Sequence, residues 1–373
     1  MKIGIDARPL ATTQYTGIGV YLKNVLDNLP EEALDPANTI YLYAQKKIIY
    51  PGLPANFSLR FGNGGMYGSV WVQTVLPFMI KKDNLDVFWG PLHVLPLLTL
   101  KRIRKVLTLH DFVYKRFPET MASGNMYIHK FLVAPSIKQA DFIISDSKST
   151  EDDLRGYFPT VKKPMKVIPP AVSLEFKKIG KSDAKKLVSL KFGLDRPYIL
   201  AVGTQEPRKN FITAFNAFKN LSGRIPHLLV STGKPGWKTG GMMDLIRQSE
   251  VAERIRFLGY VDKEDLPCIY SAADAFVFPS IYEGFGLPVL EAMACGCPVI
   301  CSDSSSIPEV AGSAAIMLPP LDTDAWIKTI EKVISDERLC AELSAKGIER
   351  AREFNWKNTS QDIWNVFKTE DGR

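Results

Sequence analysis

Residues 275–294 read AFVFPSIYEGFGLPVLEAMA and contain a strand, a glycine-bearing loop and the start of a helix. The apolar run Ala275–Phe278 is short, which is typical of a buried strand. Pro288 suits the first helical position because its missing N–H would have no partner there. Gly284 and Gly286 fall in the loop before it. This order of strand, loop and helix is the repeating unit of a parallel α/β sheet.

Runs of the same kind recur along the chain between amphipathic helical windows, and they form two series. The first series predicts strands at Lys2–Asp6, Thr39–Ala44, Asp86–Trp89, Lys105–Leu109, Phe142–Ser145 and Lys166–Ile168. The second predicts strands at Tyr198–Val202, His227–Ser231, Arg256–Leu258, Ala275–Phe278, Val299–Cys301 and Ala314–Met317. Two doubly wound parallel sheets are therefore expected, and a chain of 373 residues suits two domains.

A lysine-rich segment, residues 173–196, separates the two series, and we place the domain boundary near residue 180. The N-terminal Rossmann-like domain is then residues 1–180, and the C-terminal one is residues 181–355. A last helix, residues 356–373, is expected to cross back to the N-terminal domain. The two α/β domains would face each other across a cleft, with ligands at the carboxyl ends of the strands.

Composition excludes several classes of protein. The chain is 46% hydrophobic and 23% charged, as is usual for globular proteins. Met1–Asp6 reads as a strand rather than a signal peptide, and no uninterrupted apolar run reaches the roughly 18 residues of a membrane span, so a cytoplasmic location is expected. Cys295, Cys297 and Cys301 flank a predicted buried strand without a nearby His, which favours small apolar core residues over metal ligands.

The net charge of +7 is unevenly distributed, because the excess of Lys and Arg lies in residues 1–190. Lys81–Lys82 and the basic run Lys101–Lys105 each adjoin an apolar stretch. They form either a solvated surface or a face that rests on anionic lipid headgroups, peripheral to the inner side of the cell membrane, and admits a lipid-linked acceptor. No helix-turn-helix, zinc finger or RNA-binding pattern appears, so no nucleic-acid partner is expected.

The loop of Gly284 and Gly286 is a candidate anion site. Exposed amides at a helix N-terminus, together with the helix dipole, suit a diphosphate. Glu283 lies in the loop and Glu291 in the predicted first helical turn, so both carboxylates could face one ligand and bind sugar or ribose hydroxyls. Taken singly, each glutamate could equally be a surface charge or a residue that favours the helix dipole.

A second candidate segment, Gly203–Asn210, ends the first strand of the second domain. Gly203 and Thr204 close the strand, and Arg208 with Lys209 would project into the cleft at the start of a helix. Two cations there can neutralise a departing diphosphate without a metal ion, so no cofactor is expected.

The N-terminal domain offers two further candidates. Gly17 and Gly19 lie in a glycine-bearing turn before a helix, but Leu22 occupies the third glycine position of a dinucleotide fingerprint, which disfavours a nicotinamide dehydrogenase. His110 and Asp111 follow the strand Lys105–Leu109, where His110 could hydrogen-bond the transferred sugar or the incoming hydroxyl and Asp111 could orient it.

The stretch Glu283–Glu291 resembles the paired-glutamate motif of family 4 of the retaining glycosyltransferases, enzymes with the GT-B fold. The resemblance continues through Ala294–Ile300 and Phe257–Val261. It implies that Glu283 contacts the donor sugar, that Glu291 holds the ribose hydroxyls, and that Arg208–Lys209 clamps the diphosphate. The donor-binding residues implied are Gly17, Gly19, Gly203, Thr204, Tyr260, Val261, Gly284, Phe285, Gly286, Leu287 and Glu291. The catalytic residues implied are Glu283, Arg208, Lys209 and His110.

Ile5–Leu10 and Thr16–Gly19 are similar to the corresponding segments of bacterial mannosyltransferases of surface-polysaccharide assembly. This resemblance implies metal-independent transfer of a hexose, with retention, from GDP-mannose or a related GDP-sugar to a glycan or lipid-linked glycan in polysaccharide or lipopolysaccharide O-antigen biosynthesis. A UDP-sugar donor stays open. Competing hypotheses are an epimerase or phosphorylase on the same fold, and a non-catalytic protein that binds a nucleotide sugar and regulates a partner.

Overall fold

The computed structural model describes residues 1–369 except 13, 14, 16, 63, 64, 66, 99–102, 122, 235 and 237–239, and it leaves the side chains of 123–125 and 127 undescribed. Two compact units are present. The first comprises Met1–Pro170 and the C-terminal residues from Trp356 onwards, and the second is Ala171–Asn355.

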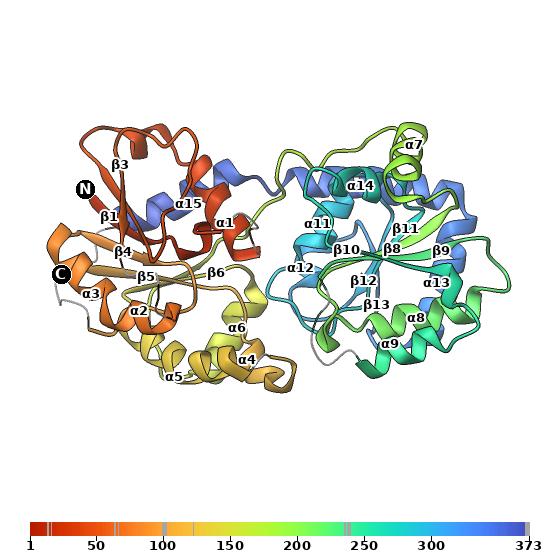
Figure 1. The fold of residues 1–373 in the computed structure, drawn as a ribbon, viewed down its shortest axis with the longest axis horizontal. Helices are drawn as coiled ribbons and strands as arrows, with labels where there is room; N and C mark the ends of the chain where they lie inside the picture. The colour runs from red at the N-terminus through yellow and green to blue at the C-terminus, as the bar shows by residue number, and fades with distance from the viewer. Residues whose placement is uncertain are drawn as a thin grey trace. The chain divides into compact units, whose positions relative to one another are not determined.

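The first unit has a seven-stranded parallel sheet in the order β3-β2-β1-β4-β5-β6-β7. Its strands are β1 (Lys2–Asp6), β2 (Thr39–Ala44), β3 (Phe57–Phe61), β4 (Val87–Gly90), β5 (Arg104–Leu109), β6 (Phe142–Ser145) and β7 (Met165–Val167). Its helices are α1 (Gly17–Asp27), α2 (Gly68–Thr74), α3 (Leu76–Asp83), α4 (Val113–Arg116), α5 (Ser123–Gln139), α6 (Lys148–Tyr157) and α15 (Trp356–Lys368). They cover both faces of the sheet (Figure 1), as a doubly wound fold requires.

The second unit has a six-stranded parallel sheet in the order β10-β9-β8-β11-β12-β13. Its strands are β8 (Tyr198–Val202), β9 (Leu228–Thr232), β10 (Ile255–Gly259), β11 (Ala275–Phe278), β12 (Val299–Ser302) and β13 (Ile316–Leu318). Its helices are α7 (Lys181–Phe192), α8 (Phe211–Leu221), α9 (Gly240–Arg247), α10 (Leu266–Ala272), α11 (Leu287–Ala294), α12 (Ile307–Ala311), α13 (Thr323–Ser335) and α14 (Glu337–Arg352). The predicted α/β class with two parallel sheets is confirmed.

The chain changes unit about ten residues before the boundary that the sequence suggests, because residues 171–180 pack with the second unit. Phe176 is buried against Tyr270, with ring centroids 6.1 Å apart. The amide of Ile179 donates to Ser271 Oγ at 3.1 Å. These contacts fix the segment to α10, so its lysines lie on the surface of the second unit rather than in a free linker.

The C-terminal helix α15 belongs to the first unit and lies beside α1 (Figure 1). Trp356, Ile363, Trp364 and Phe367 recur at helical spacing and are all buried. Ser360 Oγ donates to the carbonyl of Val25 at 3.1 Å. Burial of this stripe ties the end of the chain to its first helix.

Within the described residues, no helix combines the length and the hydropathy that crossing a membrane requires.

Candidate donor site

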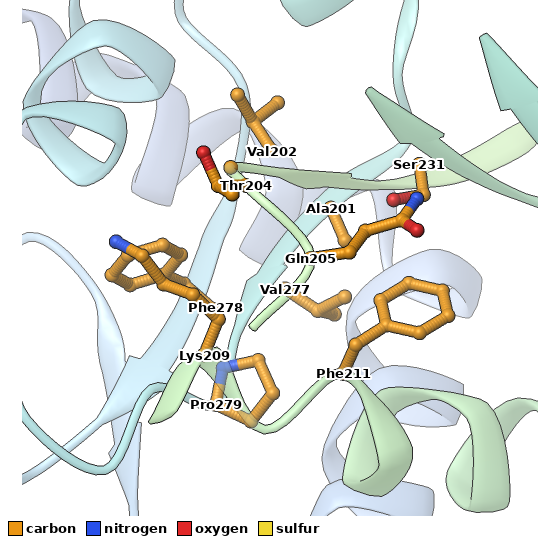
Figure 2. A pocket seen from close by; sticks show the side chains of 11 residues that line it. Ala201, Val202, Thr204, Gln205, Lys209, Phe211, Ser231, Val277, Phe278 and Pro279 are labelled. Carbon is orange, nitrogen blue, oxygen red and sulfur yellow. The ribbon is translucent and has the colours of Figure 1, made fainter. Parts of the chain in front are cut away.

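The sequence-predicted residues of the second unit gather where the strand order of its sheet reverses. β8 and β11 are adjacent parallel strands, with Ile199 paired to Ala275, and their following helices lie on opposite sides. Ligands of doubly wound sheets bind at such a reversal, beyond the carboxyl ends of the strands. A pocket lies at this point (Figure 2). It is lined by Ala201, Val202, Gly203, Thr204, Gln205, Lys209, Phe211, Ser231, Val277, Phe278 and Pro279.

Arg208 and Lys209 both contact Glu283, which comes from the loop after the neighbouring strand β11. Arg208 Nη1 donates to Glu283 Oε2 at 2.9 Å and to the carbonyl of Tyr282 at 2.6 Å. Lys209 Nζ donates to Glu283 Oε1 at 2.6 Å. It also lies 5.2 Å from the ring centre of Phe278, and Figure 2 shows these two side chains together at the pocket wall. The structure therefore brings Glu283 into contact with Arg208, 75 positions away in the chain, and with Lys209. The sequence analysis assigned these three residues to one site.

Two further side chains complete this group, and neither was predicted from the sequence. Glu206 accepts from Arg208 Nη2, and Ser280 Oγ donates to Glu283 Oε1 at 2.6 Å. We call Glu206, Arg208, Lys209, Ser280 and Glu283 the Arg208 network. Its two cations are balanced by two carboxylates, so its formal charge is zero.

Electrostatics within the Arg208 network favour an ionised Glu283. Burial alone raises the pKa of Glu283, but Lys209 and Arg208 outweigh burial, and the pKa falls to about 2. Burial lowers the pKa of Lys209, and Glu283 opposes that effect only in part. Because the charges are desolvated and paired, their geometry is fixed before any ligand arrives.

The loop after Glu283 is held by two serines that precede α12. Ser305 Oγ accepts from the amide of Glu283 at 2.8 Å. Ser306 Oγ donates to the carbonyls of Glu283 at 3.0 Å and Phe285 at 2.7 Å. Gly286 has φ +116°, a conformation that side-chain-bearing residues rarely adopt. The loop is therefore rigidly presented at the start of α11.

Helix α11 begins at Leu287, one residue earlier than the sequence suggested, so Pro288 is its second residue and Glu291 lies in its second turn rather than its first. Glu291 has partners of its own outside the Arg208 network. Tyr270 Oη donates to Glu291 Oε2 at 3.0 Å, and burial raises the pKa of Glu291 to about 7. The two glutamates are thus held in different ways, one as a buried ion pair and one by a tyrosine.

Tyr260 and Val261 follow β10, on the same edge of the sheet as the pocket. Val261 is buried, whereas Tyr260 is 45% exposed. Lys234 Nζ lies 5.1 Å from the ring centre of Tyr260. An exposed aromatic ring beside a cation is suited to stacking on a nucleobase.

The backbone around Gly203 and Thr204 is closely packed. The amide of Gly203 donates to the carbonyl of Thr232 at 2.9 Å, and the amide of Gln205 donates to the carbonyl of Lys234 at 3.2 Å. Gly203 has φ +142°. These bonds extend the pairing of β8 and β9 beyond the strands and fix the floor of the pocket.

His110 lies at the carboxyl end of β5 in the first unit, and both of its ring nitrogens are bound by the protein. Nδ1 is 2.7 Å from Asp146 Oδ2, and Nε2 is 2.8 Å from the carbonyl oxygen of Pro91. A carbonyl can only accept, so Nε2 carries a proton, and a doubly protonated ring satisfies both partners. Burial opposes the charge, but Asp146 and Pro91 raise the pKa of His110. Both ring nitrogens of His110 thus have partners within the protein, and its hydrogen bond to a sugar stays a prediction.

Replacing Asp146 with asparagine is expected to bring the pKa of His110 below its ordinary value, because burial then dominates. In the wild type the raised pKa stabilises the fold below the unfolded value of about 6.5, and this stabilisation is lost as the pH rises through the folded pKa. NMR titration of the imidazole Cε1 protons measures the shift, with His227 of the second unit as the internal control. An unchanged His110 pKa in the variant would show that Asp146 does not hold the charge.

The other residues predicted in the first unit lie on the same edge of its sheet. Asp111 Oδ1 accepts from the amide of Val113 at 3.0 Å. Gly17 and Gly19 lie in the first turn of α1 rather than in a turn before it, and the ring of Tyr21 from the same helix is 5.1 Å from that of His110. A Cβ at Gly17 would meet none of the described atoms within 4 Å. Thr16, Lys101 and Arg102 lie outside the described residues.

The three clustered cysteines are buried and unbridged, in agreement with the apolar role predicted for them. Burial raises the pKa of Cys295 and Cys301, and it raises that of Cys297 to about 12. These thiols are therefore protonated core residues at neutral pH.

Comparison with known proteins agrees with this architecture. Residues 17–176 match the family described as Glycosyltransferase Family 4, and residues 183–353 match the family described as Glycosyl transferases group 1. O-antigen chain mannosyltransferase B of Escherichia coli is 34% identical over 292 residues, which cover 77% of this chain and 75% of that protein. O-antigen chain mannosyltransferase RfbU of Salmonella typhimurium is 29% identical over 268 residues, covering 71% of this chain and 70% of that protein.

Among solved structures, sucrose-phosphate synthase from Thermosynechococcus elongatus matches 98% of this chain and 98% of its own, with a TM-score of 0.76 at 20% identity. That identity supports the fold alone. The two matched families, the related mannosyltransferases and the pair of doubly wound sheets agree with one another. The chain therefore has the GT-B fold and is a glycosyltransferase that belongs to family 4.

Proposed function

We propose that the chain transfers mannose, or a related hexose, from a GDP-sugar to a hydroxyl of a glycan or lipid-linked glycan, with retention at the anomeric carbon, in surface-polysaccharide or O-antigen assembly. The observation that carries this proposal is the Arg208 network at the carboxyl end of β8, beside the loop that leads into α11. The printed names of the related mannosyltransferases support the choice of sugar.

In the proposed reaction the donor diphosphate lies between the two cations and the N-terminal turn of α11. Because the Arg208 network carries no surplus charge, the diphosphate displaces Glu283 from at least one cation, and Glu283 becomes available to a sugar hydroxyl. The bond from the anomeric carbon to the phosphate oxygen breaks as the acceptor oxygen bonds to the same face of that carbon. The acceptor proton passes to the departing phosphate oxygen, so the side chains stabilise charge and no separate base is needed.

The proposal is tested with a panel of GDP-mannose, UDP-glucose and UDP-N-acetylglucosamine, with and without EDTA. We expect GDP-mannose to raise the melting temperature and to be hydrolysed slowly in both conditions. A UDP-sugar that does so instead would replace the proposed donor. Binding without turnover would favour a regulator. Conversion of the donor to an isomeric sugar nucleotide, in place of its hydrolysis, would favour an epimerase, and turnover that needs phosphate would favour a phosphorylase. If no sugar nucleotide binds, the proposal fails.

Retention is tested on the product. Transfer from the α-linked donor is expected to give an α-mannoside, which the coupling between the anomeric carbon and its proton identifies by NMR. A β-linked product would mean inversion and would contradict the proposed same-face attack.

We also propose that the first unit rests on anionic lipid through α3. Phe78, Lys81 and Lys82 share one face of this helix, and Phe78 is 72% exposed. The double charge reversal Lys81→Glu with Lys82→Glu is expected to weaken binding to phosphatidylglycerol vesicles by about tenfold or more, since each lysine near such a surface contributes about 1 kcal/mol. Reversal of Lys328 and Lys332 on α13 is the control in a vesicle sedimentation assay. Equal losses in both variants would contradict a specific role for α3.

A further inference from the structure

Tyr270 is a fully buried tyrosine whose hydroxyl, among the residues that the structure describes, hydrogen-bonds to Glu291, a residue predicted to bind the donor. Its ring packs edge-on against Phe276 of β11, with centroids 5.5 Å apart, and against Phe176, with centroids 6.1 Å apart. Its hydroxyl donates to Glu291 Oε2 at 3.0 Å. Because the ring is packed on two sides, the hydroxyl has a fixed position, and its hydrogen bond holds the Glu291 carboxylate in place.

The carboxylate of Glu291 uses only one of its two oxygens within the protein. Oε2 accepts from Tyr270, whereas Oε1 has no hydrogen-bond partner among the residues that the structure describes. The side chain is half-buried rather than enclosed. An ionised carboxylate accepts several hydrogen bonds, so Oε1 is available to a hydroxyl donor that enters the site.

The charged and titratable groups around Glu291 come from three segments besides its own helix. Tyr270 lies on α10, Lys263 follows β10, and Glu175 precedes α7, while Cys295 follows α11. Lys263 Nζ binds Glu175 Oε1 and Ser173 Oγ, each at 2.8 Å. Burial raises the pKa of Glu291 to about 7, Glu175 adds to this effect, and the Tyr270 hydrogen bond and Lys263 oppose it. Loss of the tyrosine hydroxyl would therefore raise this pKa further.

We propose that Tyr270 is a positioning residue for the nucleotide: its hydroxyl anchors Oε2 of Glu291 and thereby presents Oε1 to a hydroxyl of the donor ribose. The inference rests on the proposed function, because it concerns the same donor. Tyr270 acts only through Glu291. It sets both the direction of the carboxylate and the pH range in which the carboxylate is charged.

The test is calorimetric binding of GDP, 2′-deoxy-GDP and 3′-deoxy-GDP to the full chain and to Tyr270→Phe. The wild type is expected to bind one deoxy form about tenfold or more weakly than GDP, as for loss of a hydrogen bond to a charged group. Tyr270→Phe is expected to lose most of this discrimination. Tyr198→Phe is the matched control, because it removes another buried tyrosine hydroxyl, which donates to the carbonyl of Ile269 at 2.6 Å. That variant is expected to discriminate like the wild type.

The pH dependence of GDP affinity gives a second measurement, which a purely structural role of Tyr270 would not change. GDP affinity of the wild type is expected to rise through about pH 7 as Glu291 ionises, and the midpoint in Tyr270→Phe is expected at higher pH. Glu291→Gln supplies the baseline, because its profile contains the titration of the ligand phosphate without that of the carboxylate.

The outcomes separate the positioning role from the function itself. If Tyr270→Phe weakens GDP and both deoxy forms equally and keeps the wild-type midpoint, the tyrosine is only structural and the positioning role is overturned, while the donor site stands. If the wild type binds UDP but not GDP, the same comparison is made with the uridine series. If the wild type binds neither nucleotide, the proposed function fails and the positioning role fails with it.

Discussion

Replacing Glu283 with glutamine is expected to lower glycosyl transfer by about two to three orders of magnitude, the usual effect of removing one preorganised charged group from a reaction site. Glu283 holds Lys209 Nζ at 2.6 Å and Arg208 Nη1 at 2.9 Å, both as charge-assisted hydrogen bonds. A neutral amide keeps the size of the side chain but not the charge that aligns the two cations. Single-turnover transfer from the preferred donor, with circular dichroism to verify folding, measures the effect.

A surface glutamate provides the control for this variant. Glu331 pairs with Arg224 at 2.8 Å, but both side chains are substantially exposed, so Glu331→Gln is expected to leave transfer unchanged. Arg208→Ala and Lys209→Ala are expected to reduce transfer by orders of magnitude as well. Near-normal transfer in all three site variants would refute the assignment of the Arg208 network to catalysis.

Replacing Gly233 with alanine is expected to destabilise the second unit by about 3 kcal/mol or more, from backbone strain together with overpacking. Gly233 has φ +143°, and a Cβ there would lie 2.1 Å from the carbonyl oxygen of Gly203. The atoms that this Cβ would meet belong to the backbone of Gly203 and Thr204 in the pocket lining, so no flexible side chain can move aside. The change in the free energy of unfolding is measured by urea denaturation followed by tryptophan fluorescence.

Two other glycines separate strain from overpacking. Gly193→Ala introduces only strain, since φ is +64° and nothing lies within 4 Å of the added Cβ, and it is expected to cost about 1–2 kcal/mol. A Cβ at Gly240, at the start of α9, would meet no described atom within 4 Å, so Gly240→Ala is expected to change stability by less than that. If Gly233→Ala were as stable as Gly240→Ala, the close packing of the two loops would be refuted.

Much of the fold could be predicted from the sequence because buried strands of a parallel sheet leave short apolar runs, and all the predicted strands overlap observed ones. The strand β3, Phe57–Phe61, was missed because it lies at the edge of its sheet and three of its five residues are only half-buried. Its pattern therefore lacks the continuous apolar run of the inner strands. The amphipathic stretch between Asp322 and Glu353 is divided into α13 and α14 at Asp336, which caps the second helix by accepting from the amide of Leu339.

The candidate site could be predicted only as far as local motifs extend. Arg208, Lys209 and Glu283 stand out because each lies between a strand and a helix, where a parallel sheet places its ligands, and Glu291 stands out because it lies near the start of the helix that follows. Glu206 and Ser280 lie within three residues of the partners that they bind, but they belong to no motif that marks them. Asp146 and Tyr270 carry no signal because they meet His110 and Glu291 only when segments distant in the chain pack together. Asp146, for example, follows β6, and its neighbour His110 follows β5. The charge balance of the Arg208 network and the raised pKa of His110 therefore required the structure.

The central claim is that the donor diphosphate binds at the carboxyl ends of β8 and β11. The most direct measurement is a crystal structure of the chain with bound GDP. We expect the diphosphate within hydrogen-bond distance of Arg208, Lys209 and the first-turn amides of α11, and a ribose hydroxyl on Glu291. A nucleotide bound instead at the carboxyl ends of β1 and β4 in the first unit, with Arg208 and Lys209 untouched, would contradict the claim.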